Sequence, residues 1–244
     1  RKMFEFRFMY LYIYEAFRRE YYILYSILKW WLIVSKREGI MMRIFGFIIY
    51  RIAFFFFRRK VQEFVQILEL IQRDNNLRFS SQVRQKLEKC LIVAEDKRFY
   101  LHRGIDLISL IRSILIGIIH NGKITTMSTV EQQLVRTITN NKEYTIKRKV
   151  NELLLATVIE PIVPKNEILF LYLKLAYFGW RMNGIEQVFK RLDYSFTELS
   201  LSQAASIIAR LKYPEPRSPS RTRIMQIETR KRYILDRLRL KEEI

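Results

Sequence analysis

The chain has 244 residues, half of them hydrophobic, and 44 Lys or Arg against 24 Asp or Glu give it a formal charge of +20. This composition excludes a disordered chain, and Cys90, the single cysteine, excludes an internal disulfide. The basic charge suits two kinds of polyanion, nucleic acid and an anionic membrane surface. Seven Gly and five Pro are few for a sheet-rich fold, so we predict an all-α fold.

The first part of the chain is both basic and aromatic. From Arg1 to Lys60, 13 Lys or Arg and four Asp or Glu are mixed with many Phe, Tyr, Trp, Ile and Leu. No uncharged run reaches the ~18 to 20 residues that a clean spanning helix needs. Cations flank Trp30-Trp31 and Phe54 to Phe57, which favours lipid contact over core packing. We predict membrane-associated helices over residues 1–72, either spanning with snorkelling charges or lying at the interface.

The rest of the chain is predicted to form one helical domain over residues 73–244. A helix at Val61 to Ile71 ends in a polar break at Arg73 to Asn76, which we take as the domain boundary. Ser80-Ser81 is a plausible N-cap for the first helix of the domain. No strand pattern competes with the helices predicted at Gln82 to Ala94, Leu107 to His120, Thr129 to Thr139, Ile146 to Ile159, Lys165 to Phe178, Gly184 to Arg191, Ser202 to Leu211 and Thr222 to Arg239.

The densest polar cluster runs from Ala94 to Asp106 and contains two adjacent carboxylates, Glu95 and Asp96, with a His and a Gly. Such a group in a mostly apolar helical protein is a candidate acid/base site. Spacing alone favours a simpler interpretation, in which Gly104 is a helix C-cap and Asp106 caps the next helix.

Two further polar clusters open helices. Ser128 to Arg136 places hydroxyls at a helix N-terminus, where free N–H groups favour an anion, although an N-cap by Ser128 explains the pattern equally well. Lys147-Arg148-Lys149 opens an apolar helix with three cations, followed by Glu152. Cations there oppose the helix dipole, so an anionic ligand explains them better than a structural role.

In order and spacing, these three clusters resemble the glycosyltransferase domain of class A penicillin-binding proteins and the monofunctional peptidoglycan transglycosylases. The family motif E-D-x-x-F-x-x-H-x-G-x-D is intact from Glu95 to Asp106. The next motif, G-G-S-T-I-T-Q-Q, is similar to Thr126 to Gln133, and R-K-x-x-E matches Arg148 to Glu152. Later family segments match around Lys165 to Gly179 and Leu199 to Pro219. The resemblance covers about Gln82 to Pro219.

The resemblance implies a lysozyme-like, two-lobed helical domain with one lobe partly sunk in the outer face of the bacterial inner membrane. It implies an inverting glycosyltransferase that polymerises lipid II into glycan strands and releases undecaprenyl pyrophosphate. Glu95 would be the general base for the 4-hydroxyl of the acceptor, and Asp96 beside it would help to tune that base. Glu152 resembles the family's second essential Glu, on the donor side.

The leaving pyrophosphate would need fixed cations or a divalent metal ion, such as Mg²⁺ or Mn²⁺. Arg136, Arg148 and Lys149 are the candidates for the cations, and we name no metal ligand. The full set of substrate-binding residues that the resemblance implies is Asp96, Phe99, His102, Ser128, Thr129, Gln132, Gln133, Arg136, Arg148 and Lys149.

Several positions depart from the family pattern. Thr126-Met127 replaces a Gly pair, Glu131 stands where the family has Thr, and Tyr144 stands where it usually has an Arg that contacts pyrophosphate. Phe170 and Lys174 replace a Glu and an Asn of the fourth motif. Because Glu95 and Glu152 remain, altered rate, altered substrate or control by a partner is expected rather than loss of catalysis.

Two alternatives stay open: a transferase acting on another polyprenyl-pyrophosphate-linked saccharide, and a degenerate paralogue that binds lipid-linked sugar or scaffolds a cell-wall complex. The expected partners are the lipid-linked substrate, the membrane and other cell-wall synthesis proteins. Nucleic acid is not expected, because no reader motif accompanies the charge. The expected location is the inner membrane, with the catalytic domain on its periplasmic face.

Overall fold

The computed structural model describes residues 55, 58–71, 79–106, 108–109, 128–141, 143, 145–159 and 162–242. The chain divides into two compact units, Arg1–Phe57 and Arg58–Ile244. Most of the predicted membrane segment, residues 1–72, lies outside the described residues, and its association with a membrane stays a prediction. No helix in the described ranges combines the length and the apolar character needed to cross a bilayer.

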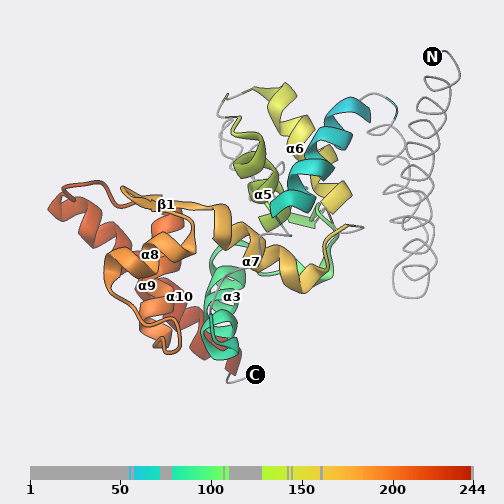
Figure 1. The fold of residues 1–244 in the computed structure, drawn as a ribbon. Coiled ribbons are helices and arrows are strands. Elements are labelled where there is room, and N and C mark those ends of the chain that lie inside the picture. Colours follow the sequence, from blue (N-terminus) through green and yellow to red (C-terminus); the bar gives the residue numbers. More distant parts are fainter. Residues whose placement is uncertain are drawn as a thin grey trace, which may run out of the picture. The chain divides into compact units, whose positions relative to one another are not determined.

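Helices dominate the described part of the second unit, in agreement with the predicted helical fold (Figure 1). Residues 58–71 are helical, and residues 108–109 are a fragment of the helix predicted from Leu107. Each remaining predicted helix has a counterpart within a few residues of its expected ends. The elements are α3 (Ser81–Glu95), the 3-10 helix η1 (Phe99–Leu101), α5 (Val130–Thr139), α6 (Ile146–Ile159), α7 (Lys165–Leu175), β1 (Tyr177–Gly179), β2 (Met182–Asn183), α8 (Ile185–Leu192), α9 (Leu201–Lys212) and α10 (Arg221–Glu242).

Local capping explains where several helices begin. Ser80 is the N-cap of α3, as predicted, and its hydroxyl accepts a hydrogen bond from the Val83 N–H. Ser200 and Gln203 form a reciprocal capping box at the start of α9. For α5 the N-cap is Thr129 and not Ser128: the Thr129 hydroxyl accepts from the Gln132 N–H, which leaves Ser128 outside the helix.

A short β-hairpin corrects the prediction of an uninterrupted helix from Lys165 to Phe178. α7 ends at Leu175, and β1 then pairs antiparallel with β2. Gly179 has a φ of 141°, and a Cβ there would overlap the backbone of Glu215. A local apolar pattern does not reveal this turn, because it depends on a close approach to a distant segment.

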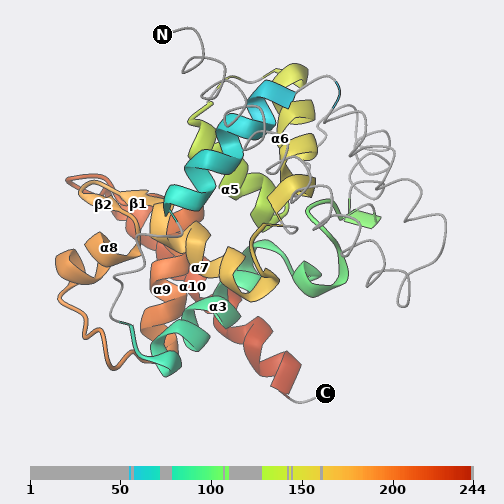
Figure 2. The same ribbon diagram turned by 45° about the vertical axis from the view of Figure 1, so that its right-hand side comes forward.

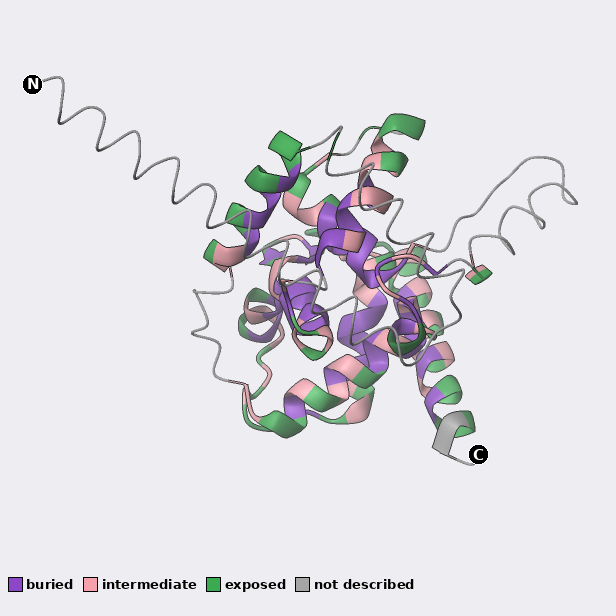
Figure 3. Cartoon of the chain, turned by 90° about the vertical axis from the view of Figure 1, so that its right-hand side faces the viewer, coloured by how far each residue is buried: buried purple, intermediate pink, exposed green. Residues whose placement is uncertain are grey.

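In the described part of the second unit, the helices form two groups. α5 packs against α6 and α7, while α3, α9 and α10 pack against one another. α7 also contacts α3 and α8, so it joins the two groups, and Figure 2 shows the hairpin beside α8. Buried residues concentrate where the helices face one another, and exposed residues lie on their outer sides (Figure 3).

The helix at residues 58–71 belongs to this compact unit and contributes to its core. Val61, Phe64, Val65 and Leu68 are 0–7% exposed, at the helical spacing that the sequence indicated. The Lys174 ammonium donates to the carbonyl of Ile71, which links this helix to α7. The predicted domain boundary after residue 72 falls in residues 72–78, outside the described part, and stays a prediction.

Candidate functional site

Glu95, the expected general base, is the last residue of α3, and its side chain is 18% exposed. Each of its carboxylate oxygens has a different partner. The Gln133 amide on α5 donates to Oε2 over 3.2 Å, and Arg230 Nη2 on α10 lies 3.2 Å from Oε1. Sequence reasoning missed Arg230, because it lies 135 residues from Glu95 and outside the segment in which family motifs were recognised.

A tyrosine fixes the orientation of the Gln133 amide. The Tyr172 hydroxyl on α7 donates to Gln133 Oε1 over 2.7 Å, so the amide NH₂ group faces Glu95. Burial raises the pKa of Tyr172 well above its ordinary value, and the charge of Glu95 acts in the same direction. Tyr172 therefore stays a neutral donor at any working pH.

Asp96 does not point its carboxylate at the solvent. Both of its oxygens lie 3.0 Å from His102 Nε2, and Oδ2 also accepts from the Val130 N–H in the first turn of α5. Asp96 and His102 are each 6% exposed. The hydrogen bond from Val130 ties the end of α3 to the start of α5, and the contact with His102 fixes the Asp96 carboxylate, so Asp96 positions the backbone around Glu95.

Gly104 lies in the loop after η1 and is not the predicted helix C-cap, since α3 ends nine residues earlier. Its φ is +75°, and a Cβ would overlap the carbonyl of Ala156 on α6. The Gly104 carbonyl accepts hydrogen bonds from the Thr129 hydroxyl and the Gln132 amide. Glycine is needed because the loop is held between α5 and α6.

Asp106 caps the next helix turn, as predicted. Its Oδ1 accepts from the N–H groups of Ile108 and Ser109, and the Ser109 hydroxyl donates to Oδ2 over 2.6 Å. Burial opposes ionisation, but the Ser109 hydrogen bonds and the charge of Arg98 outweigh it, so the pKa of Asp106 lies below its ordinary value. Asp106 therefore stabilises the fold in its ionised form.

Replacing Asp106 with Ala is expected to lower the free energy of unfolding by about 1 kcal/mol at neutral pH, the usual loss for an N-cap. Because the folded-state pKa of Asp106 is depressed, its contribution is fully present above the unfolded-state pKa, near ~4. It is lost as pH falls through the folded-state pKa. Urea denaturation at pH 7 and near pH 3 measures this difference, with the exposed Asp236→Ala as control. A loss of equal size at both pH values would contradict the role of the ionised carboxylate.

A cationic cluster lies at the start of α6. Arg148 forms an ion pair and a hydrogen bond with Glu152, which is 3% exposed, and Lys149 Nζ lies 3.6 Å from the other oxygen of Glu152. Lys149 also donates to the Ser128 hydroxyl and to Gln132 Oε1. Burial lowers the pKa of Lys149, and the nearby cations of Arg136 and Arg148 add to this while Glu152 opposes it. These cations thus have a structural role that the helix-dipole argument did not foresee.

α5 connects the two predicted catalytic carboxylates. Gln133 binds Glu95, and its neighbour Gln132 binds Lys149, which lies against Glu152. Two neighbouring residues of α5, Gln133 and Gln132, therefore link the predicted general base, Glu95, to the surroundings of the predicted donor-side carboxylate, Glu152.

Glu131, which replaces a family Thr, is fully buried and forms an ion pair with Lys165. The same ammonium donates to the His102 carbonyl and lies 4.1 Å from the centre of the Phe99 ring. One ligand atom each of Asp96, His102 and Glu131 lies within 4.8 Å of the others, and this is the one such group among the described residues. Lys165 already neutralises Glu131, and the set is not the all-oxygen octahedron that Mg²⁺ prefers. The predicted Mg²⁺ or Mn²⁺ is not assigned to these residues.

Burial separates the predicted substrate-binding residues into two kinds. Six of them are buried and have partners within the chain, so they support the site in this structure: Asp96, Phe99, His102, Thr129, Gln132 and Gln133. Arg136 is exposed, and Ser128, Arg148 and Lys149 are partly exposed. The substituted loop residues Thr126-Met127 and also Tyr144 lie outside the described residues. Contact of any of these side chains with substrate stays a prediction.

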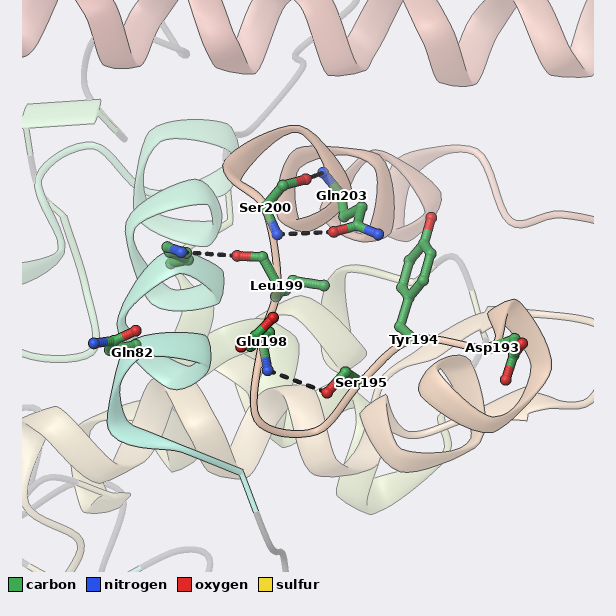
Figure 4. A pocket seen from close by; sticks show the side chains of 9 residues that line it. Gln82, Asp193, Tyr194, Ser195, Glu198, Leu199, Ser200 and Gln203 are labelled. Atoms are coloured by element: carbon green, nitrogen blue, oxygen red, sulfur yellow. Dashed lines mark hydrogen bonds between the residues drawn. The ribbon is translucent and has the colours of Figure 1, made fainter.

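Two pockets differ in their relation to this site. One, of about 360 Å³, is lined by the helix at residues 58–71, α5 and α6 and includes Arg148 and Glu152. The other, of about 570 Å³, lies between α3 and the segment from Asp193 to Gln203 (Figure 4). It contains none of the predicted site residues. Several of its polar groups bind each other: Lys86 donates to the Leu199 carbonyl, and Ser195 accepts from the Glu198 N–H.

The described residues thus form a helical domain with two predicted catalytic carboxylates: Glu95 is partly exposed and held by two donors, and Glu152 lies among cations. The transglycosylase family model matches residues 60–239, and the chain belongs to this family. The match extends into α10 and therefore includes Arg230.

The chain is similar to the glycosyltransferase region of class A penicillin-binding proteins. It is 31% identical to penicillin-binding protein 1A of Rickettsia prowazekii over 160 residues, 64% of this chain and 20% of that protein. It is 34% identical to penicillin-binding protein 1A of Haemophilus influenzae over 157 residues, 64% of this chain and 18% of that protein. Identity to penicillin-binding protein 1B of the same organism is 32% over 175 residues, 68% and 22% of the two chains. The chain thus matches about a fifth of the length of these relatives.

Proposed function

We propose that the chain polymerises lipid II into peptidoglycan glycan strands. Glu95 removes the proton from the 4-hydroxyl of the acceptor sugar, and this oxygen attacks the anomeric carbon of the donor. The bond from that carbon to the pyrophosphate oxygen breaks, so undecaprenyl pyrophosphate leaves with the bonding electron pair and the anomeric configuration inverts. Membership of the transglycosylase family supports this reaction class.

The observation that carries the proposal is the exposure of the Glu95 carboxylate together with its hydrogen-bond partners. Its carboxylate is partly exposed, and single donors from α5 and α10 bind its two oxygens. A carboxylate oxygen accepts more than one hydrogen bond, so lone pairs remain for a substrate hydroxyl. A general base must be both held in place and reachable, and Glu95 meets both conditions.

The leaving pyrophosphate is assigned to the cations near Glu152. Arg136 is exposed, and Arg148 and Lys149 lie on the adjoining first turn of α6. Preorganised cations stabilise charge that grows in the transition state more than charge already present in the substrate. A divalent cation carried by the pyrophosphate would add to this effect, and its requirement remains part of the proposal.

The 360 Å³ pocket beside Glu152 suits an amphiphilic donor. It combines the apolar side chains of Phe64, Ile67, Val135 and Leu155 with the charged Arg148–Glu152 pair. A polyprenyl pyrophosphate has the same combination of an apolar chain and an anionic group. This supports a lipid-linked saccharide as substrate and does not distinguish lipid II from other members of that class.

The proposed location is the periplasmic face of the inner membrane. The aromatic and basic sequence from Arg1 to Lys60 supports it, as do the exposed apolar side chains Ile67, Leu70, Ile146 and Val150 on the helix at residues 58–71 and on α6. Other cell-wall synthesis proteins are the proposed partners. A lysozyme-like, two-lobed fold remains a proposal that the two groups of helices in the second unit support.

The test is polymerisation of lipid II by the purified full chain in detergent, with the product resolved by gel electrophoresis and moenomycin as inhibitor control. Glycan polymer that moenomycin abolishes is the expected result. Activity only on another polyprenyl-pyrophosphate saccharide would replace the substrate and keep the mechanism. Binding of lipid-linked sugar without any product would favour the degenerate scaffold instead.

A further inference from the structure

Arg230 lies in the middle of α10 (Arg221–Glu242), which packs against α3 and α9. Its side chain is 16% exposed. Arg230 Nη2 donates to the carbonyl of Ala94 over 2.6 Å and to Glu95 Oε1 over 3.2 Å. One guanidinium nitrogen therefore binds both the backbone at the C-terminal end of α3 and the carboxylate of the last residue of that helix.

A contact with an aromatic ring and the dipole of α3 also limit the freedom of this guanidinium. Its carbon atom lies 5.0 Å from the centre of the Tyr233 ring, one turn further along α10. The carbonyl of Ala94 is one of the last of α3, which have no partner within the helix, so a cation there is favoured by the helix dipole as well. The position of Arg230 is thus defined independently of Glu95.

Glu95 is consequently held from two sides. Gln133, oriented by Tyr172, binds Oε2, while Arg230 binds Oε1. With only the Gln133 contact, the carboxylate would be free to rotate about that hydrogen bond. A second donor on the other oxygen removes this freedom, and the cost of misplacing a catalytic group by about 1 Å is roughly 100-fold in rate.

We infer that Arg230 is a positioning residue for Glu95, acting on the proposed glycosyl transfer through that carboxylate and not through the substrate. The inference rests on the proposed function. Because Arg230 acts only through Glu95, its removal is expected to lower kcat by roughly 10- to 100-fold, with little change in KM for lipid II.

The test measures lipid II polymerisation by the full chain as wild type, Arg230→Gln, Arg230→Lys, Glu95→Gln and the double variant Glu95→Gln/Arg230→Gln. Lys retains a cation but has no forked guanidinium, so it should recover part of kcat. In the Glu95→Gln background, loss of Arg230 should lower the residual rate no further, because the group that it positions no longer acts as a base.

Arg237→Gln is the matched control: Arg237 lies on the same helix, is exposed, and contacts the same Tyr233 ring at 5.5 Å. It should keep wild-type kcat. Thermal unfolding of each variant reports on folding separately. An Arg230→Gln protein with wild-type kcat, or a loss of equal size with and without the Glu95 carboxylate, would overturn the inference while the proposed function stands. A wild-type protein without polymerase activity would overturn both.

Discussion

The Glu95→Gln variant is expected to polymerise lipid II about 10²- to 10⁴-fold more slowly than the wild type, the range for loss of a positioned general base. Gln has nearly the same shape and keeps one of the two acceptor oxygens, but it does not accept a proton at neutral pH. Glu95 is 18% exposed and lies at a helix end, so the substitution should leave folding and substrate binding nearly unchanged. Initial rates of polymer formation and thermal unfolding measure the two effects.

Asp106→Asn is the comparison variant for this experiment. Asp106 belongs to the same family motif but bonds to Ile108 and Ser109, and Asn is also a good N-cap. Its effect on the rate should therefore be much smaller than that of Glu95→Gln. Wild-type polymerisation by a folded Glu95→Gln protein would refute the proposed mechanism.

The Arg148→Ala variant is expected to lose both stability and affinity for pyrophosphate. Glu152 is 3% exposed, and removal of one partner from a buried ion pair typically costs 3 to 5 kcal/mol. Lys149 remains 3.6 Å from Glu152, so we expect a loss near the lower end, about 3 kcal/mol in the free energy of unfolding. The sequence pattern, which predicts only an anionic ligand, implies little change in folding.

Lys147→Ala provides the matched control, because Lys147 is an exposed cation in the same first turn of α6. Urea denaturation should show a much larger loss of unfolding free energy for Arg148→Ala than for Lys147→Ala. Binding of a pyrophosphate-bearing lipid by protein that is still folded should be weaker by about 1.5 to 3 kcal/mol in Arg148→Ala. If the two variants were equally stable, the Arg148–Glu152 pair would not be the buried interaction described above.

The family assignment depended on motifs that are local in sequence. The spacing from Glu95 to Asp106, and the order of the later clusters, predicted the family to which the chain belongs. The helices were predictable for a similar reason, since apolar residues recur at intervals of three and four and caps such as Ser80 lie directly before them. Both kinds of information are contained in short stretches of chain.

The roles of individual side chains were less predictable. Phe99 and His102 belong to the recognised motif, but the sequence did not indicate that Phe99 would be fully buried or that His102 would pair with Asp96. The strand pair at Tyr177–Asn183 was missed because it depends on a close approach to Glu215. In each case the deciding contact joins residues whose spacing carries no regular pattern.

The sequence by itself determined the helical class, the positions of most helices and the two motifs that contain the predicted catalytic carboxylates Glu95 and Glu152, because each of these follows from residues near one another in the chain. Only the tertiary structure decided what surrounds the carboxylates: Arg230 from α10 and Gln133 from α5 at Glu95, and the Arg148 pair at the buried Glu152. The physical reason is that hydrogen bonds and ion pairs act over about 3 Å in space, and helix packing brings together groups more than 100 residues apart.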